Sequence, residues 1–128
     1  MDTINGVRTR SGFVWTLVGA VITATGVWAF AAPHSFYDTI ATYPPYNRHL
    51  FHDIGAFTIG LGLAFFIAMR VRSALTVAIA ANAAAAVLHA ISHIIDRDLG
   101  GKASDPWVLS AVGLALALPA IRRMRGAR

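Results

Sequence analysis

Residues 74–95 read ALTVAIAANAAAAVLHAISHII, and this stretch decides the fold. It is mostly apolar over about 20 residues, which at about 1.5 Å of rise per residue spans a hydrocarbon core of roughly 30 Å. Three further apolar stretches lie around it, at residues 12–32, 50–69 and 107–121. The sequence therefore predicts an all-α integral membrane protein, a four-helix bundle that forms one domain over residues 1–128.

The overall composition agrees with a membrane protein. Hydrophobic residues make up 56% of the chain and charged residues only 13%, about half the charged share of a typical soluble domain. So few charges do not cover a water-soluble surface, and the lipid bilayer is the expected partner. The chain has no cysteine, which excludes disulfides, thiolate zinc sites, iron–sulfur clusters and cysteine nucleophiles.

The basic residues predict the orientation of the four helices. Loops 33–48 and 96–106 hold few of them, diluted by aspartates. By the positive-inside rule, we expect a multi-pass plasma-membrane protein with both termini in the cytoplasm. The net charge of +5 comes mainly from these flanking clusters, so nucleic acid is not an expected partner. The clusters on the predicted inner side are Arg8 and Arg10, Arg70 and Arg72, and Arg122, Arg123, Arg125 and Arg128.

Aromatic residues support the same orientation, because tyrosine and tryptophan favour the membrane interface. They gather beside the predicted outer loops and form an interfacial belt of Trp28, Phe36, Tyr37, Tyr43, Tyr46 and Trp107. All five histidines lie on this outer side as well: His34, His49, His52, His89 and His93. A random distribution of histidines would rarely place all of them at one side, so they mark a candidate site.

The spacing of the histidines places them on two helix faces. One set stands at i, i+3 and i+4 and the other at i, i+4 and i+7, and both spacings keep side chains on one face. The sets are His49, His52 and Asp53 on the second helix, and His89, His93 and Asp96 on the third. Asn82, seven residues before His89, extends the second set toward the bilayer centre.

The two faces are expected to meet. A short link around residues 70–73 makes the second and third helices antiparallel neighbours. Counting from that link puts His52 level with His89, and His49 level with His93, within roughly 3 Å of rise. Four imidazoles and two carboxylates at one level would suit zinc, copper or iron. Alternatively, His52 and His89 would hold a haem between the helices.

The function expected from this cluster is metal or haem binding, with redox chemistry at the outer face. Histidines inside a membrane span mark functional sites by default. A structural interpretation stands beside it, because Asp53 lies near the start of its helix, where a carboxylate is favourable without any function. We expect His34 to be an interfacial residue. The alternative function is a non-catalytic structural or assembly subunit of a larger membrane complex.

Enzymatic activity is left open by the sequence. It holds no Walker loop, no dinucleotide-binding glycine pattern and no serine nucleophile elbow. With four short spans and little outside the membrane, the chain is expected to work as a homo-oligomer or as a subunit of a membrane complex. Small residues at helical spacing predict tight helix packing, which lipid alone does not drive. They form a ridge of Ala56, Gly60 and Ala64, and an alanine-rich run over residues 80–86.

One stretch carries a family resemblance. Residues 47–57, NRHLFHDIGAF, lead into GLGL at residues 60–63. Together with the four-span layout, this stretch resembles small actinobacterial membrane proteins of the broad DoxX-like type. Some of those proteins have a histidine-rich segment at the position of His89 and His93. The resemblance implies a four-span fold and, through DoxX itself, a link to quinone-coupled redox chemistry.

Overall fold

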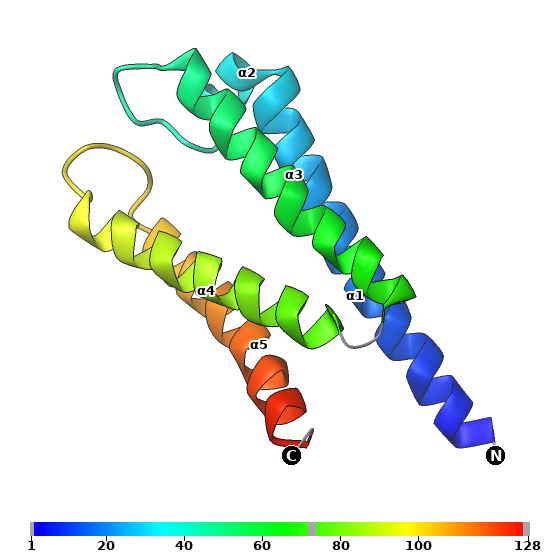
Figure 1. Cartoon of the computed structure of the whole chain (residues 1–128). Helices are drawn as coiled ribbons and strands as arrows, with labels where there is room; N and C mark the ends of the chain where they lie inside the picture. The colour runs from blue at the N-terminus through cyan, green and yellow to red at the C-terminus, as the bar shows by residue number, and fades with distance from the viewer. Residues whose placement is uncertain (1, 72–73, 127–128) are drawn as a thin grey trace.

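A computed structural model describes residues 2–71 and 74–126. Within these residues the regular secondary structure is all helical, without a strand (Figure 1). The helices are α1 (Asp2–Ala31), α2 (Pro33–Thr39), α3 (Arg48–Arg70), α4 (Ala74–Ile95) and α5 (Asp105–Gly126). Four of them contain segments long and apolar enough to cross a membrane: Gly12–Ala31, Arg48–Arg70, Ala74–Ile95 and Asp105–Gly126. The predicted all-α fold with four membrane-length helices is confirmed.

The helix boundaries follow local sequence signals. Asn47 caps α3, since its side chain accepts a hydrogen bond from the Leu50 backbone N–H at 3.2 Å. The fourth long helix is longer than the predicted 107–121, because its C-terminal arginines continue the helix to Gly126. Helix α2 was not predicted from the sequence. It begins at Pro33, where the fixed backbone angle of proline favours a first helical turn.

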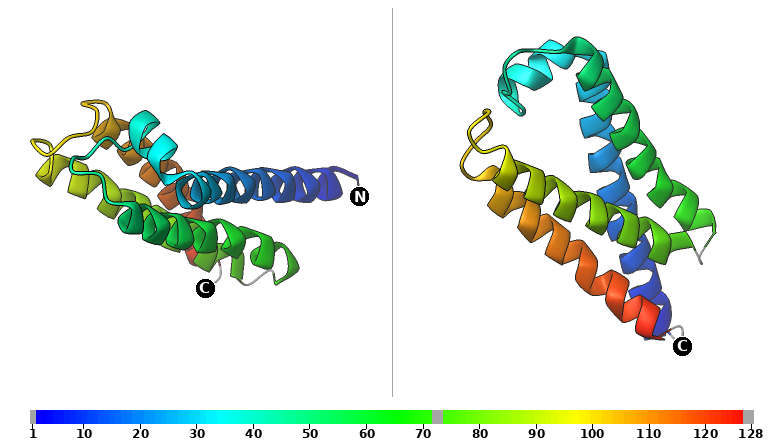
Figure 2. Two further views of the ribbon diagram at one scale, coloured as in Figure 1. Left: turned by 90° about the horizontal axis from the view of Figure 1, so that it is seen from above. Right: turned by 60° about the vertical axis from the view of Figure 1, so that its left-hand side comes forward.

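The long helices form two antiparallel pairs, α1 with α3 and α4 with α5 (Figure 1). The pairs are joined where α3 ends at Arg70 and α4 begins at Ala74, which we call the link end. From there they diverge toward the loop end, formed by residues 32–47 and 96–104 (Figure 2). Helices α3 and α4 are neighbours as expected, but they separate along their length.

Glycines hold α1 against α3. Gly19 and Gly26 on α1 meet Gly62 and Gly55 on α3, and the two members of each set stand seven positions apart. A Cβ on Gly26 would lie 2.6 Å from the Ile59 backbone nitrogen, so only glycine permits this approach. The predicted ridge contributes only Ala64, which packs against the core, because Ala56 is exposed and a Cβ on Gly60 would meet nothing within 4 Å. The expectation that Gly60 lies in a helix contact is therefore wrong within this chain.

A smaller buried cluster of Ala29, Phe36 and Phe51 lies where α2 packs against α1 and α3, and the main core lies toward the link end, where both helix pairs meet. Phe65 of α3 and Ile79 of α4 are fully buried there. Asn82 is 5% exposed, and its Nδ2 donates to the carbonyl oxygens of Leu61 at 3.3 Å and Ala78 at 3.0 Å. The side chain that was expected to extend the histidine face instead ties α4 to α3, which satisfies an amide that lipid would leave unpaired.

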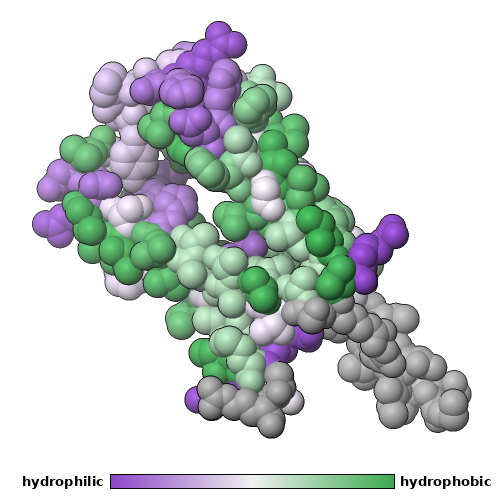
Figure 3. Space-filling model, in the orientation of Figure 1, coloured by the Kyte–Doolittle hydropathy of each residue, from purple (hydrophilic) through white to green (hydrophobic). Residues whose placement is uncertain are grey.

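The exposed surface of the long helices is suited to contact with lipid. Large apolar side chains on the long helices are exposed, including Phe13, Phe57 and Leu114. Hydrophilic side chains gather at the loop end, while the helices below it are mainly hydrophobic (Figure 3). This distribution is what lipid contact requires, since apolar atoms facing water would be unfavourable.

Candidate functional site

The predicted six-residue cluster is not assembled. Among the residues that the structure describes, no group of three or more histidine, cysteine, aspartate or glutamate side chains is placed to hold a metal ion. His52 packs against Phe30 of α1, with ring centroids 5.1 Å apart, whereas His89 packs against His93. Counting residues from the link predicted that His52 and His89 lie at the same depth. Because α3 and α4 diverge and are rotated relative to one another, the two side chains contact different neighbours.

The remaining α3 candidates form a local pair. His49 Nε2 lies 3.5 Å from Asp53 Oδ2, and the two side chains are 84% and 51% exposed. His34 makes a similar contact with Asp38, with 2.9 Å between Nδ1 and Oδ2. Exposed pairs of this kind, four residues apart on one helix, contribute little to stability. Nothing in their geometry distinguishes them from ordinary surface pairs.

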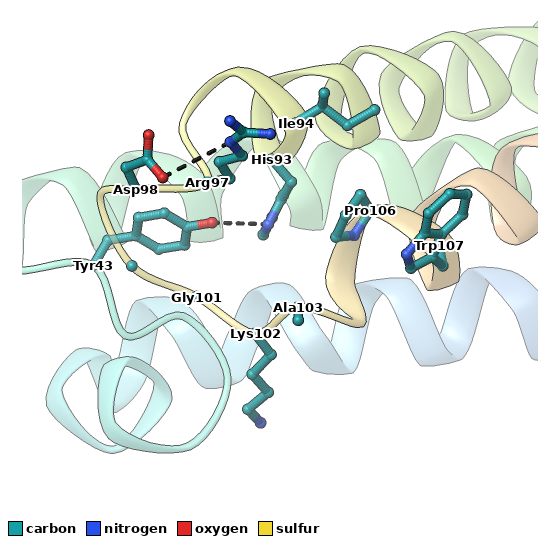
Figure 4. Close-up of a pocket in the computed structure, with 11 residues that line it drawn as sticks. Tyr43, His93, Ile94, Arg97, Asp98, Gly101, Lys102, Ala103, Pro106 and Trp107 are labelled. Atoms are coloured by element: carbon teal, nitrogen blue, oxygen red, sulfur yellow. Dashed lines mark hydrogen bonds and ion pairs between the residues drawn. The ribbon is translucent and has the colours of Figure 1, made fainter.

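The α4 candidates form a closer arrangement. His89 and His93 stand one helical turn apart and share a hydrogen bond with 3.1 Å between their Nε2 atoms. The other ring nitrogen of His93, Nδ1, lies 2.8 Å from the Tyr43 hydroxyl (Figure 4). Tyr43 comes from the loop before α3, so the contact joins the two helix pairs. The structure therefore brings together His89, His93 and Tyr43, and we call His89 and His93 the histidine pair.

Asp105 lies beside this arrangement. Its Oδ2 is 3.7 Å from His93 Nδ1, and it accepts a hydrogen bond of 2.8 Å from the Lys102 backbone N–H. That backbone contact fixes the carboxylate at the start of α5, where a negative charge is favourable. Asp96, the predicted third member of this set, follows the last residue of α4, and its backbone N–H donates to the Ser92 carbonyl oxygen at 2.8 Å.

The Tyr43 hydroxyl keeps its proton at neutral pH and can therefore form hydrogen bonds. Burial raises the pKa of Tyr43 above its ordinary value, and the negative charges of Asp105 and Asp96 raise it further. A neutral hydroxyl can either donate to the imidazole or accept from it. Tyr43 therefore orients His93 through its Nδ1 atom and leaves Nε2 directed toward His89.

A hollow of about 410 Å³ adjoins His93. Its lining includes Tyr43, Arg97, Gly101 and Trp107, which come from the two loops of the loop end and the start of α5 (Figure 4). The hollow combines polar groups with an exposed aromatic face. It offers space for a small ligand or water next to the imidazole.

Sequence reasoning missed Tyr43 and Asp105 as members of this site. Tyr43 was assigned only to the interfacial belt, and Asp105 only to the charge balance of its loop. The available signal was the Gly100-Gly101 dipeptide, because adjacent glycines in a loop often mark a close approach of backbone. That signal does not say which residue approaches, and Tyr43 is 50 residues away from His93.

Comparisons with known proteins add no assignment. No protein-family model matches the chain, and neither a curated protein nor a solved structure matches it. The resemblance to DoxX-like proteins stays a prediction. The functional argument therefore rests on the geometry of the chain itself.

Proposed function

We propose that this protein is a multi-pass membrane protein that binds a transition-metal ion at its loop end through His89 and His93. The observation that supports this most is the distance of 3.1 Å between the two Nε2 atoms. Two imidazole nitrogens at about 2.0–2.1 Å from a tetrahedral metal lie about 3.3 Å apart. Small side-chain shifts would convert the hydrogen-bonded pair into a chelating pair.

The surroundings of His93 support the same proposal. A metal-ligating histidine usually donates its second ring N–H to a neighbouring oxygen, which fixes the ring and its tautomer. Tyr43 Oη lies 2.8 Å from His93 Nδ1 and occupies that position. With Nδ1 protonated toward the tyrosine, Nε2 carries the lone pair that a metal needs.

The imidazole ligands restrict the proposed metal to the transition metals that favour nitrogen ligands. Zinc, copper and iron all accept imidazole ligands, and copper or iron would add redox chemistry where zinc would not. Two protein ligands leave coordination positions for water, a small ligand or a histidine of a second copy. A haem held between His52 and His89 receives less support, because His52 packs against Phe30.

Orientation is part of this proposal. The link end carries exposed arginines, namely Arg70, Arg122, Arg123 and Arg125. The positive-inside rule places such an end in the cytoplasm. The loop end with the histidine pair would then lie on the outer face of the plasma membrane, and both termini in the cytoplasm.

A non-catalytic assembly subunit is the second candidate, and one observation favours it. Gly60 lies on an exposed face of α3 where a Cβ would meet nothing within 4 Å, beside exposed Ala56. Small residues on a lipid-facing surface allow the backbone of another helix to approach closely. This face would hold a helix of a partner subunit.

Metal content separates the two candidates. The purified full chain is loaded with zinc, copper or iron, dialysed and measured by elemental analysis, with about one ion per chain expected for a specific site. His89→Ala and His93→Ala should each lose the ion. His34→Ala and His49→Ala are matched controls, because both histidines are exposed and paired with aspartate. Sub-stoichiometric metal in the unmodified protein, or equal loss in the controls, would favour the assembly subunit.

A further inference from the structure

A strap of residues 39–43 lies against the loop after α4, and its last residue contacts His93. We propose that this strap is a lid that opens and closes access to His93, the covered member of the histidine pair. As a form of regulation it rests on the function proposed above, although its contacts and its test need no bound metal.

Three contacts join the strap to the α4–α5 half of the molecule. The Gly101 backbone N–H donates to the Thr42 carbonyl oxygen at 3.0 Å, and Lys102 Nζ donates to the Thr39 carbonyl oxygen at 3.0 Å. The third is the bond of 2.8 Å between Tyr43 and His93. All three connect a segment between α2 and α3 to the α4–α5 half of the molecule. They bridge the helix pairs at the end where the pairs have diverged.

The α4–α5 loop is shaped to receive the strap. Gly100 has φ +145° and Gly101 has φ +77°, a backbone region that favours glycine. A Cβ on Gly101 would collide with the Tyr43 hydroxyl and lie 2.8 Å from its Cζ atom. A Cβ on Gly100 would lie 3.1 Å from the Tyr43 Cα atom. The two glycines form a notch that accepts Tyr43 only because they lack side chains.

The strap explains the unequal exposure of the histidines. The His93 side chain is 12% exposed, whereas His89, one turn away, is exposed. Tyr43 covers His93 from the side of the hollow (Figure 4). Release of the strap would uncover His93 from the side of the hollow.

The hydrogen bonds that close the lid can break locally while the helices stay folded. They are three hydrogen bonds at an exposed loop, with Thr39, Thr42 and Lys102 all solvent-accessible. Ala41 of the strap packs against a separate cluster around Phe36 and Phe51, on the α1–α3 side. Segments with few buried contacts open at much lower free energy than the core. Neither the main core around Phe65 and Ile79 nor the smaller cluster of Ala29, Phe36 and Phe51 includes these bonds, so the lid can open without unfolding the helix pairs.

Chemical modification of histidine tests the lid directly. The full chain in detergent is treated with diethyl pyrocarbonate, and each histidine is followed by peptide mass spectrometry. His49, at 84% exposure, is the internal reference. In the unmodified protein we expect His93 to react much more slowly than His49. Gly101→Ala should raise the His93 rate about tenfold, because the added Cβ strains a positive-φ position and displaces Tyr43.

Two further variants keep the test decisive. Lys102→Met removes the bond to Thr39 without changing a glycine, and it should raise the His93 rate about threefold. Gly60→Ala is the matched control, because its Cβ meets open space, and it should leave the rate unchanged. The circular dichroism spectrum reports whether each variant is folded.

The lid is overturned if His93 reacts as fast as His49 in the unmodified protein. It is also overturned if folded Gly101→Ala and Lys102→Met leave the His93 rate unchanged. Failure of metal binding would not alter these rates, so the lid and the metal proposal fail separately. If both hold, the two strap variants should also speed metal exchange.

Discussion

Gly26 on α1 and Gly55 on α3 face each other where the backbones of the two helices approach closely. A Cβ on Gly26 would lie 2.9 Å from the Gly55 carbonyl oxygen, and a Cβ on Gly55 would lie 2.8 Å from the Gly26 carbonyl oxygen. Gly19 and Gly62 repeat the relationship two turns away. Backbone-to-backbone packing of this kind replaces the hydrophobic drive that lipid does not supply.

Adding one methyl group at this contact should loosen the α1–α3 pair. Gly55→Ala is expected to lower the free energy of unfolding by about 1–3 kcal/mol, because backbone atoms cannot move aside as side chains do. Gly60→Ala, on the open face of the same helix, should be neutral or raise it by about 0.5–1 kcal/mol. Unfolding in detergent, followed by circular dichroism, measures both. Equal effects would contradict the assigned interface.

Asn82 should matter for the contact between α3 and α4. Asn82→Leu removes the bond from Nδ2 to the Leu61 carbonyl oxygen while keeping the number of non-hydrogen side-chain atoms. Hydrogen bonds between membrane helices contribute about 0.6–1.7 kcal/mol, so a loss of about that size is expected. The same unfolding assay checks it. An unchanged free energy of unfolding would show that the amide does not stabilise the helix contact.

Tyr43 should make the closed lid sensitive to alkaline pH. Its pKa is raised above the ordinary value by burial and by the charges of Asp105 and Asp96. The folded state therefore favours the protonated hydroxyl, and its contribution to stability is complete below about pH 10. That contribution is lost as pH rises through the raised pKa. The tyrosinate absorbance of the unmodified protein and of Tyr43→Phe is followed as pH rises, and the difference between them reports Tyr43. This difference should titrate above pH 10. A transition below pH 10 would contradict the raised pKa of Tyr43.

Membrane orientation can be tested with single cysteines, because the chain has none of its own. An impermeant maleimide applied to intact cells should label Lys102→Cys, at the loop end, and not Arg125→Cys, at the link end. Both side chains are exposed, so accessibility within the protein does not separate them. Labelling of Arg125→Cys alone would reverse the proposed orientation.

The sequence predicts the helices better than it predicts their faces. Apolar length identifies every long helix, since a span needs about 20 apolar residues whatever its neighbours are. Which face packs is harder to predict, because in lipid both faces are apolar. The Gly60 ridge and the Gly55–Gly62 face read alike, and only the second contacts α1.

The same holds for the candidate site: local spacing in the sequence predicts contacts within one helix, but not contacts between distant segments. The i, i+4 spacing of His89 and His93 correctly predicts a shared face, because helical geometry alone fixes it. The meeting of His52 with His89 required the rotation and divergence of two helices, which residue counting does not contain. Tyr43 reaches His93 only through the fold of two loops, so no local pattern predicts it.

X-ray absorption spectroscopy of the metal-loaded protein tests the central proposal most directly. We predict two imidazole nitrogens at about 2.0–2.1 Å from a bound zinc ion. The His89→Ala, His93→Ala double variant should lose this imidazole signature, while His49→Ala should keep it. A first shell of oxygen atoms alone in the unmodified protein, or an imidazole signature that persists in the double variant, would contradict metal binding by the histidine pair.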